Sequence, residues 1–517
     1  MTLKQKNLTI ATLIYIYIPV VIFLIGFTRL LICIPCLLAL LFVTRRFLLL
    51  INDKCNRFIR IDKRALIMGV IILLLIGFFS GWGRWVNQVY DWYKHNAVLK
   101  DLVERKWPVY YVNGKETSML TYYVGQYLVP AIVGKCFNSF RSAEVMLYIW
   151  NEIGLFLVWL QLLIFMNNTS ALAQIFETIC LIFFHVPQSL TELIEKIVYD
   201  IDNFGTNWVY INDGEIILQY SGNYCVLEWV FNQTIVPWLI VLLFLEYKDD
   251  IKMYLYFMLP MLIFAVLPLV GMVPLAVGYA LNKYISERNI KAFFKEVFSL
   301  DNLLCITFLG MPLILYYYGN VLANKPASLS LRFIDYKKYL GVYFIFIICN
   351  VVLYACCLIR NYLHSPLFYL AFGYLLIVPL FSMGYYNDLV MRSSIPSLFI
   401  VMCFVIDYLT KNFDAIMQTI KKKRNKDRLS RKQITNLLPY LAVVALLVNA
   451  GQYQISMLMK AIRTEINATT ISESNYGTLE FFANRAYAEM SVEERSSAIA
   501  QKMRDMIMRE VQRYWKI

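Results

Sequence analysis

The stretch VIILLLIGFF, residues 70–79, is apolar on every face. Strands of an outer-membrane barrel alternate apolar and polar residues over about ten positions, so this stretch excludes a barrel. Similar apolar runs recur along all 517 residues, of which 59% are hydrophobic and 16% charged; the mean hydropathy is +0.56. Soluble globular proteins have roughly 45–50% apolar residues. The sequence therefore predicts a polytopic α-helical membrane protein.

Eleven apolar segments have a length suited to a membrane span. They cover residues 10–27, 30–43, 65–82, 145–165, 171–186, 225–245, 303–318, 340–359, 367–383, 395–409 and 437–450. A twelfth segment, residues 253–281, is interrupted by three prolines and a glycine, and fits either one kinked helix or a hairpin of two short helices. The hairpin gives about 13 transmembrane helices in total.

The distribution of charge predicts the sides of the membrane and favours the hairpin. Seven cations lie in residues 45–64 and nine in residues 411–432, both next to apolar spans. Cytoplasmic loops carry an excess of Lys and Arg, and only the hairpin places both clusters on the cytoplasmic side. The N-terminus is then inside and the C-terminus outside. The net charge of +14 is explained by these loops, so no nucleic-acid partner is expected.

Two regions are expected: a transmembrane bundle with outer loops and a short outer tail. The bundle covers residues 1–452, and its outer loops cover residues 83–141, 189–223 and 319–339. Residues 453–517 form the tail, in which Ser491 and Glu494 have the spacing of a capping box before an apolar stripe. The tail is predicted to end in a helix on the membrane surface or against an outer loop.

The first outer loop contains the strongest candidate site. Asp91, Lys94 and His95 follow a membrane span by a few residues and are surrounded by aromatic side chains. If residues 90–104 are helical, the carboxylate and the two basic groups share one face, as do Asp101 and Arg105. An interfacial aromatic belt with local ion pairs would also produce this composition.

The same loop resembles the first outer loop of GT-C glycosyltransferases, integral membrane enzymes that use sugars carried on polyprenyl phosphates. The resemblance rests on YDWYKHN at residues 90–96, AVLKDLVERKWPV at residues 97–109, and the stretch from Tyr122 and Tyr123 to LVPAIVGK, about a tenth of the chain. It implies that Asp91 is the acidic residue that follows an early membrane helix, and that surface helices come next. Two additional spans precede that helix here, where many members have one.

A second candidate is GYYNDLVMRSSIP, residues 384–396, which places Asp388 and Arg392 between two spans. At a spacing of four residues they would pair on a helix, and the pair would then neutralise itself. The predicted topology nevertheless places Arg392 on the same face as Asp91. A guanidinium there suits a lipid phosphate, which it can hold with two hydrogen bonds.

The remaining charges give weaker signals. Glu152, Glu177, Glu228 and Asp407 lie within spans, where a protonated or hydrogen-bonded acid most often stabilises helix packing. With three histidines in the chain and no HExxH motif, no hydrolytic metal centre and no cofactor are expected. A divalent ion held by Asp91 and an acid from residues 189–220 stays an open alternative.

These features together predict a membrane glycosyltransferase of a bacterial plasma membrane. It would transfer a hexose or pentose from a polyprenyl-phosphate donor to a glycan, lipid or protein acceptor on the outer face. Asp91 would be the general base. Arg392, with its partner Asp388, and Lys94 and His95 would hold the phosphate, and Tyr122 and Tyr123 would contact the substrate.

Two other classes of protein remain open. A transporter or flippase of a lipid-linked or small anionic substrate would use residues 253–281 as a discontinuous helix and the buried acids as proton sites, although the sequence has no internal repeats. A polysaccharide polymerase or ligase is also multi-span, but a ligase would be expected to carry its large outer loop late in the chain.

Overall fold

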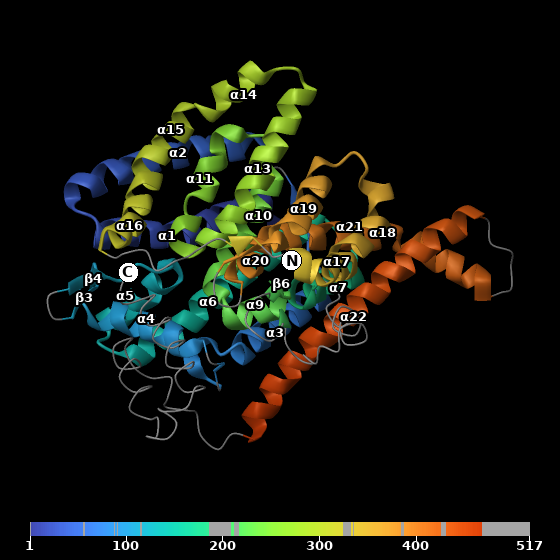
Figure 1. The fold of residues 1–517 in the computed structure, drawn as a ribbon, viewed down its shortest axis with the longest axis horizontal. Helices are drawn as coiled ribbons and strands as arrows, with labels where there is room; N and C mark the ends of the chain where they lie inside the picture. Colours follow the sequence, from blue (N-terminus) through green and yellow to red (C-terminus); the bar gives the residue numbers. More distant parts are fainter. Residues whose placement is uncertain are drawn as a thin grey trace.

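The computed structural model is a bundle of helices, and its first long loop forms helices at one end (Figure 1). It describes residues 2–54, 57–86, 88–89, 91–113, 116–185, 208–210, 217–323, 332–333, 336–383, 387–424 and 431–467. Most of the predicted outer loop 189–223 and about half of the loop 319–339 fall outside these residues, and Ser491 and Glu494 of the tail fall wholly outside them.

Within the described residues, eight helical stretches are long and apolar enough to cross a membrane, or nine if a bent pair counts as one span. This confirms a polytopic helical bundle. The eight are α1 (Gln5–Phe27), α2 (Leu30–Lys54), α6 (Phe140–Met166), α13 (Val266–Ser286), the run α14 (Ile290–Val297), α15 (Leu300–Cys305), η4 (Ile306–Gly310) and α16 (Met311–Ala323), the run α17 (Tyr336–Ile347), η5 (Ile348–Val352) and α18 (Leu353–Tyr362), α21 (Ile395–Arg424) and α22 (Arg431–Asn467).

Shorter helices complete the bundle. They are α3 (Lys63–Phe79), α4 (Trp92–Glu104), α5 (Gly125–Cys136), α7 (Ala171–Phe183), α9 (Asn223–Trp229), α10 (Ile235–Tyr247), α11 (Tyr254–Met258), α12 (Met261–Phe264), α19 (Pro366–Ile377) and α20 (Asp388–Ser393), with single turns η1 (Trp82–Arg84), η2 (Phe231–Gln233), η3 (Ile251–Met253) and η6 (Val378–Leu380). Several are shorter than the roughly 17–25 residues of a typical span. The expected number of 13 spans is therefore not reached by length and composition.

Among the residues that the structure describes, four short antiparallel strand pairs, which the sequence did not predict, join loops to one another. The pairs are β1 (Thr2–Lys4) with β2 (Phe58–Arg60), β3 (Tyr110–Asn113) with β4 (Glu116–Met119), β5 (Trp208–Tyr210) with β6 (Ile217–Gln219), and β7 (Arg332–Phe333) with β8 (Phe381–Ser382). The first pair holds the N-terminus beside the cationic loop of residues 45–64.

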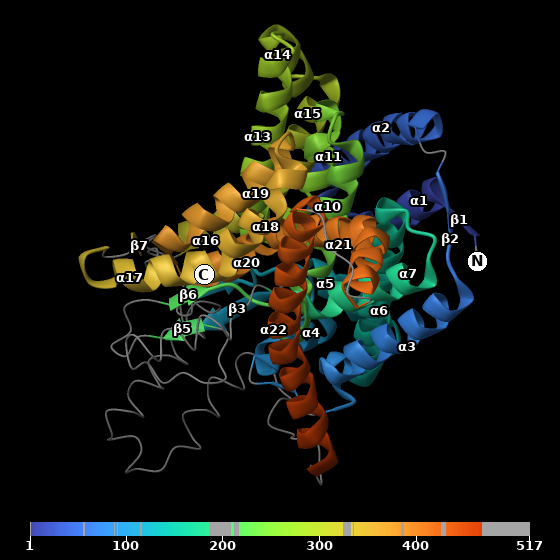
Figure 2. The same ribbon diagram turned by 90° about the vertical axis from the view of Figure 1, so that its right-hand side faces the viewer.

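Ion pairs show which chain segments meet at this cationic end. Arg57 lies 3.4 Å from Glu246, which is near the end of α10. Arg46 lies 3.1 Å from Asp301, at the start of α15. Lys283, in the last turn of α13, lies 3.7 Å from Asp249. The first cationic loop therefore lies with the ends of α10 and α13 and the start of α15 at one end of the bundle, where α14 packs on α13 (Figures 1 and 2).

Residues 253–281 form two antiparallel segments. The helical turns of η3, α11 and α12 end at Ala265, where the backbone leaves the helical region (φ −164°, ψ 75°), and α13 then begins. The hydroxyl of Tyr279 donates to Asp249 Oδ1 at 3.2 Å, so the late part of α13 returns to where the first segment began. The chain therefore turns back at Ala265 instead of continuing as one kinked helix, and the two crossings of the predicted hairpin stay a prediction.

The predicted straight span of residues 225–245 is wrong, because α9 and the helix from η2 through α10 meet at 114°. Val230 between them has φ −139° and ψ 38°. The hydroxyl of Thr234 donates to the carbonyls of Val226 (3.2 Å) and Val230 (2.9 Å), which also accept the amide N–H groups of Val230 (3.0 Å) and Gln233 (2.8 Å). Side chains that hydrogen-bond the local backbone in this way compete with helix continuation.

The last described helix is longer than predicted. The expected span of residues 437–450 is the middle of α22, which has 37 residues and lies along α18 and α21 (Figures 1 and 2). Residues 453–467, assigned above to the outer tail, continue the same helix. The side-chain amide of Gln454 reaches α9, where its Oε1 accepts the Cys225 N–H at 3.1 Å.

Candidate functional site

Asp91 stands at the start of α4, which spans nearly all of the helix predicted at residues 90–104. Its carbonyl accepts the amide N–H groups of Lys94 (3.1 Å) and His95 (3.4 Å), which close the first helical turn. Its carboxylate makes no capping hydrogen bond in the described part of the chain and is partly exposed. The helix therefore fixes the position of Asp91 without using its carboxylate.

His95 is buried, with an exposed fraction of 1%, and both of its ring nitrogens lie close to protein atoms. Nε2 is 3.0 Å from the Trp229 carbonyl and Nδ1 is 2.6 Å from the Tyr127 hydroxyl. A carbonyl only accepts, so Nε2 carries the proton and the hydroxyl donates to Nδ1. The imidazole thus joins α4, α5 and α9.

Burial and nearby charged side chains shift the pKa of His95. The pKa of His95 is lowered to about 4, chiefly by burial and also by Lys94 and Arg392, while Asp91 and the hydrogen bond to the Trp229 carbonyl act in the opposite direction. His95 is therefore neutral at pH 7 and adds no positive charge to the site. The same interactions show that Asp91 and Lys94 from α4 and Arg392 from α20 act on one imidazole, although about 300 residues separate them in sequence.

Asp388 and Arg392 form the predicted ion pair on α20, with the guanidinium Nη2 2.8 Å from the carboxylate Oδ1. The exposed fractions of their side chains are 19% and 12%. The other predicted pair, Asp101 and Arg105 on α4, is also present at 3.0 Å. Both pairs have the spacing of four residues that places side chains on one helix face.

Tyr122 and Tyr123 precede α5, and their described contacts connect the loop to α16. The Tyr122 N–H donates to the Tyr316 hydroxyl at 3.1 Å, and that hydroxyl donates to the Leu120 carbonyl at 2.8 Å. The two adjacent tyrosine rings are 5.1 Å apart between centroids. These contacts give Tyr122 a structural part, and none of them joins it to Asp91.

Glu228, which was predicted to stabilise helix packing, and its neighbour Trp229 lie next to the Asp91 end of α4. The Trp92 indole N–H donates to the Glu228 carbonyl at 3.1 Å, and the Trp229 indole N–H donates to Glu228 Oε2, also at 3.1 Å. Glu228 is buried, with 4% exposed, and Lys460 of α22 acts on it electrostatically. A signal in the sequence was the polar run Asn232, Gln233 and Thr234, which begins three residues after Trp229.

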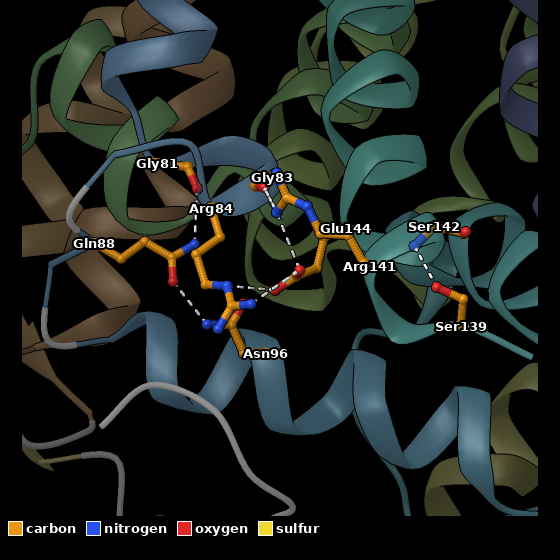
Figure 3. Close-up of polar contacts among 9 residues, drawn as sticks. All are labelled: Gly81, Gly83, Arg84, Gln88, Asn96, Ser139, Arg141, Ser142 and Glu144. Atoms are coloured by element: carbon orange, nitrogen blue, oxygen red, sulfur yellow. Dashed lines mark hydrogen bonds and ion pairs between the residues drawn. The ribbon is translucent and has the colours of Figure 1, made fainter. Parts of the chain in front are cut away.

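The loop between α3 and α4 is held by a buried carboxylate (Figure 3). Glu144 near the start of α6 has 2% of its side chain exposed, and its Oε2 accepts from Arg84 Nη2 (3.4 Å) and Arg141 Nη1 (3.1 Å). Its Oε1 forms an ion pair with Arg84 Nε at 2.8 Å. Arg141 Nη1 also donates to the Gly83 carbonyl at 2.7 Å. Two guanidinium groups and one carboxylate thus connect the loop to α6.

A second chain of hydrogen bonds connects the loop to α4 (Figure 3). Gln88 Nε2 donates to the Gly81 carbonyl at 2.8 Å, and Asn96 Nδ2 donates to Gln88 Oε1 at 2.7 Å. Gly81 and Gly83 have φ of 83° and 76°, values that glycine adopts without strain. The approach of the chain to Asp91 is therefore fixed from both sides.

No group of three or more His, Cys, Asp or Glu side chains suited to a metal ion occurs among the described residues. Most of residues 189–220, which would supply the second acid to Asp91, lie outside that part of the chain. The site is thus defined here by Asp91, Lys94, His95 and Arg392.

In comparisons with known proteins, no family model, curated protein or solved structure matches this chain. The chemistry of the site is therefore inferred from its own residues.

Proposed function

We propose that this protein is a membrane glycosyltransferase that moves a sugar from a polyprenyl phosphate to an acceptor hydroxyl at the outer face. One observation supports the proposal: a carboxylate (Asp91) and a cation (Lys94) of α4, and a second cation (Arg392) about 300 residues later, all act electrostatically on the buried imidazole of His95. A base beside an anion-binding pair is what sugar transfer from a phosphate requires.

In this mechanism Asp91 accepts the proton of the acceptor hydroxyl as its oxygen attacks the anomeric carbon. The bond from that carbon to the phosphate oxygen breaks, and negative charge grows on the leaving phosphate. Arg392 and Lys94 stabilise that charge, and the guanidinium offers two parallel N–H donors to it. The transferred sugar retains its hydroxyl groups, and polyprenyl phosphate is the second product.

His95 has a positioning part in this mechanism, since it is neutral and its two nitrogens contact Tyr127 and Trp229. By joining α4 to α5 and α9 it fixes the helix turn that presents Asp91 and Lys94. This replaces the expected part of His95 as a cation that holds the phosphate.

The proposal includes a complete topology of 13 crossings in a plasma membrane, with the shorter helices α3, α7, α10, α11–α12 and α19 also crossing. It is supported by the contacts that place residues 45–64 at one end of the bundle and by the shared electrostatics of Asp91 and Arg392. Single cysteines in residues 45–64 and 425–430 should react only after a membrane-permeant reagent is added. A cysteine at position 388 should react with a reagent that cannot cross the membrane. If cysteines at positions 91 and 392 react from opposite sides of the membrane, Asp91 and Arg392 do not share a site.

The bent pair of α9 and α10 favours a second candidate, a transporter or flippase of a lipid-linked or small anionic substrate. Discontinuous helices are typical of transporters, where they form the substrate site. The two candidates differ in what Asp91 does, because a transporter needs no base to attack a sugar.

The test of the proposal is Asp91→Asn. We expect a normally folded protein whose transfer rate falls by about 10²–10⁴-fold, because an amide keeps the shape but accepts no proton. Mass spectrometry of envelope glycans in a deletion strain restored with wild type or variant measures the product. Glu104→Gln, at a half-exposed position of the same helix, is the matched control. Near wild-type product from Asp91→Asn contradicts the proposal.

Arg392 requires its own test because of its ion pair with Asp388. If it holds a phosphate, Arg392→Lys lowers donor turnover, Arg392→Ala lowers it further, and adding Asp388→Ala restores nothing. If it only neutralises Asp388, the double alanine variant recovers turnover. Full recovery removes Arg392 from the site.

A further inference from the structure

The turn η2, where the bent pair breaks, carries two buried amide side chains. Asn232 and Gln233 each have an exposed fraction of 1%. Neither the amide nitrogen nor the amide oxygen of either side chain has a hydrogen-bond partner among the described residues. Buried polar atoms in folded proteins are nearly always hydrogen-bonded, and four such atoms on neighbouring residues need an explanation.

Other partnerless amide atoms lie on the helices that pack beside this turn. Gln126 Nε2 of α5 donates to Asn151 Oδ1 of α6 at 2.6 Å, while Gln126 Oε1 and Asn151 Nδ2 have no partner in the described part of the chain. A methyl group on Gly154 of α6 would touch Ile235. Asn151 lies one helical turn before Gly154, and η2 lies just before Ile235, so these amides are at a similar depth in the bundle.

The turn also adjoins the proposed catalytic site. Phe231, the first residue of η2, stacks on Trp92 with ring centroids 5.0 Å apart and an interplanar angle of 14°, and its centroid is 5.1 Å from that of His95. Trp92 follows Asp91 directly. The unpartnered amides of Asn232 and Gln233 therefore directly follow Phe231, whose ring packs on the first turn of α4.

The chemistry of these groups selects their ligand. An uncharged amide offers donors and an acceptor together, as a sugar hydroxyl also does. A phosphate needs donors or positive charge, which Arg392 and Lys94 supply, and an alkyl chain would leave the amides without partners. A neutral ligand with several hydroxyl groups matches them best.

We propose that Asn232 and Gln233 bind the hydroxyl groups of the donor sugar and so determine which sugar is transferred. This rests on the proposed function, because it assumes a sugar attached to a lipid phosphate. The donor is favoured over the acceptor because both amides are buried within the bundle, at the start of the apolar helix α10, where a lipid-linked group would arrive. The sugar would satisfy atoms that the free protein leaves unpaired.

The test compares binding of decaprenyl phosphate with binding of its glucosyl, mannosyl and arabinosyl forms to the full-length protein in nanodiscs. We expect wild type to bind at least one glycosylated form more tightly than decaprenyl phosphate itself. Asn232→Leu and Gln233→Met should each reduce that preference about tenfold, the effect of losing roughly one buried hydrogen bond. Affinity for decaprenyl phosphate itself should not change.

Thermal unfolding of the ligand-free variants gives an independent measurement. Both substitutions should raise the melting temperature, because they remove buried polar atoms that have no partner. The matched control is Asn350→Leu on η5, where the amide has 1% exposed and both its polar atoms also lack partners among the described residues. It should raise the melting temperature without changing the preference for sugar.

The outcomes separate the two proposals. If wild type does not bind decaprenyl phosphate, the proposed function fails, and the sugar site fails with it. If wild type binds decaprenyl phosphate but prefers no glycosylated form, or if the variants keep the preference, the sugar site is overturned and the glycosyltransferase proposal stands. A lower melting temperature in both variants also overturns it, since the amides would then have structural partners such as buried water.

Discussion

Glu144→Gln tests how strongly the buried ion pairs hold the loop that leads to Asp91. The carboxylate has 2% of its side chain exposed and faces Arg84 at 2.8 Å and Arg141 at 3.1 Å. An amide of the same shape leaves the two guanidinium groups near each other without a negative charge between them. Removing one partner of a buried ion pair costs about 3–5 kcal/mol.

The lower end of that range applies here. The side chains of Arg84 and Arg141 are 20% and 42% exposed, so water can solvate part of the uncompensated charge. We therefore expect the free energy of unfolding to fall by about 3 kcal/mol. Transfer activity should fall as well, because Gly83 would lose its fixed partner and the approach to Asp91 would loosen.

The measurement is denaturant unfolding of the purified protein in mixed micelles, followed by intrinsic tryptophan fluorescence. Glu104→Gln is the matched control: its partner Lys100 is 3.8 Å away and the Glu104 side chain is 49% exposed, so a loss below about 1 kcal/mol is expected. A similar small loss for Glu144→Gln would refute the reasoning that this carboxylate stabilises the loop.

The pH dependence of the free energy of unfolding should depend on His95. In the folded protein its imidazole stays neutral down to about pH 4, while in the unfolded chain it takes up a proton near pH 6.5. Wild type should therefore lose about 3 kcal/mol more than His95→Gln as the pH falls through this interval, and parallel unfolding curves for the two proteins would contradict this. Gly271→Ala should lower both stability and transfer, because its methyl group would overlap the Ser393 carbonyl oxygen beside Arg392. The control is Gly373→Ala, where the added methyl group has no atom within 4 Å. Its melting temperature, measured by circular dichroism, should be unchanged or slightly raised. Equal melting temperatures and transfer rates for the two glycine variants would show that α13 and α20 need no close contact.

Local patterns in the sequence predicted the parts of the fold that depend on them. Apolar length predicted most of the long helices, and the spacing of Asp101 and Arg105 and of Asp388 and Arg392 predicted ion pairs that the structure contains. The cationic loops predicted that the chain turns back within residues 253–281, because Lys and Arg in short loops favour the cytoplasmic side.

Features that depend on tertiary packing were not predictable. Whether Glu144 pairs with Arg84 depends on the folded loop, since 60 residues separate them. The neutrality of His95 depends on Tyr127 and on the Trp229 carbonyl, which are brought to it by α5 and α9. The break at Val230 is accompanied by hydrogen bonds from the Thr234 side chain to the local backbone, which compete with helix continuation. The mean hydropathy of an apolar segment does not detect such bonds.

The length of α22 gives the depth of the site in the bilayer. Its apolar part begins near Leu437, and Lys460 lies 23 residues further on, about 35 Å along a helix. The hydrocarbon core is about 30 Å thick, so in the proposed topology a helix along the membrane normal would carry the ammonium group to the outer headgroup layer. Because Lys460 acts electrostatically on Glu228, which adjoins Trp92, the proposed topology would place the first turn of α4 near that same level. A lipid whose chain stays in the hydrocarbon would present its phosphate there without leaving the bilayer.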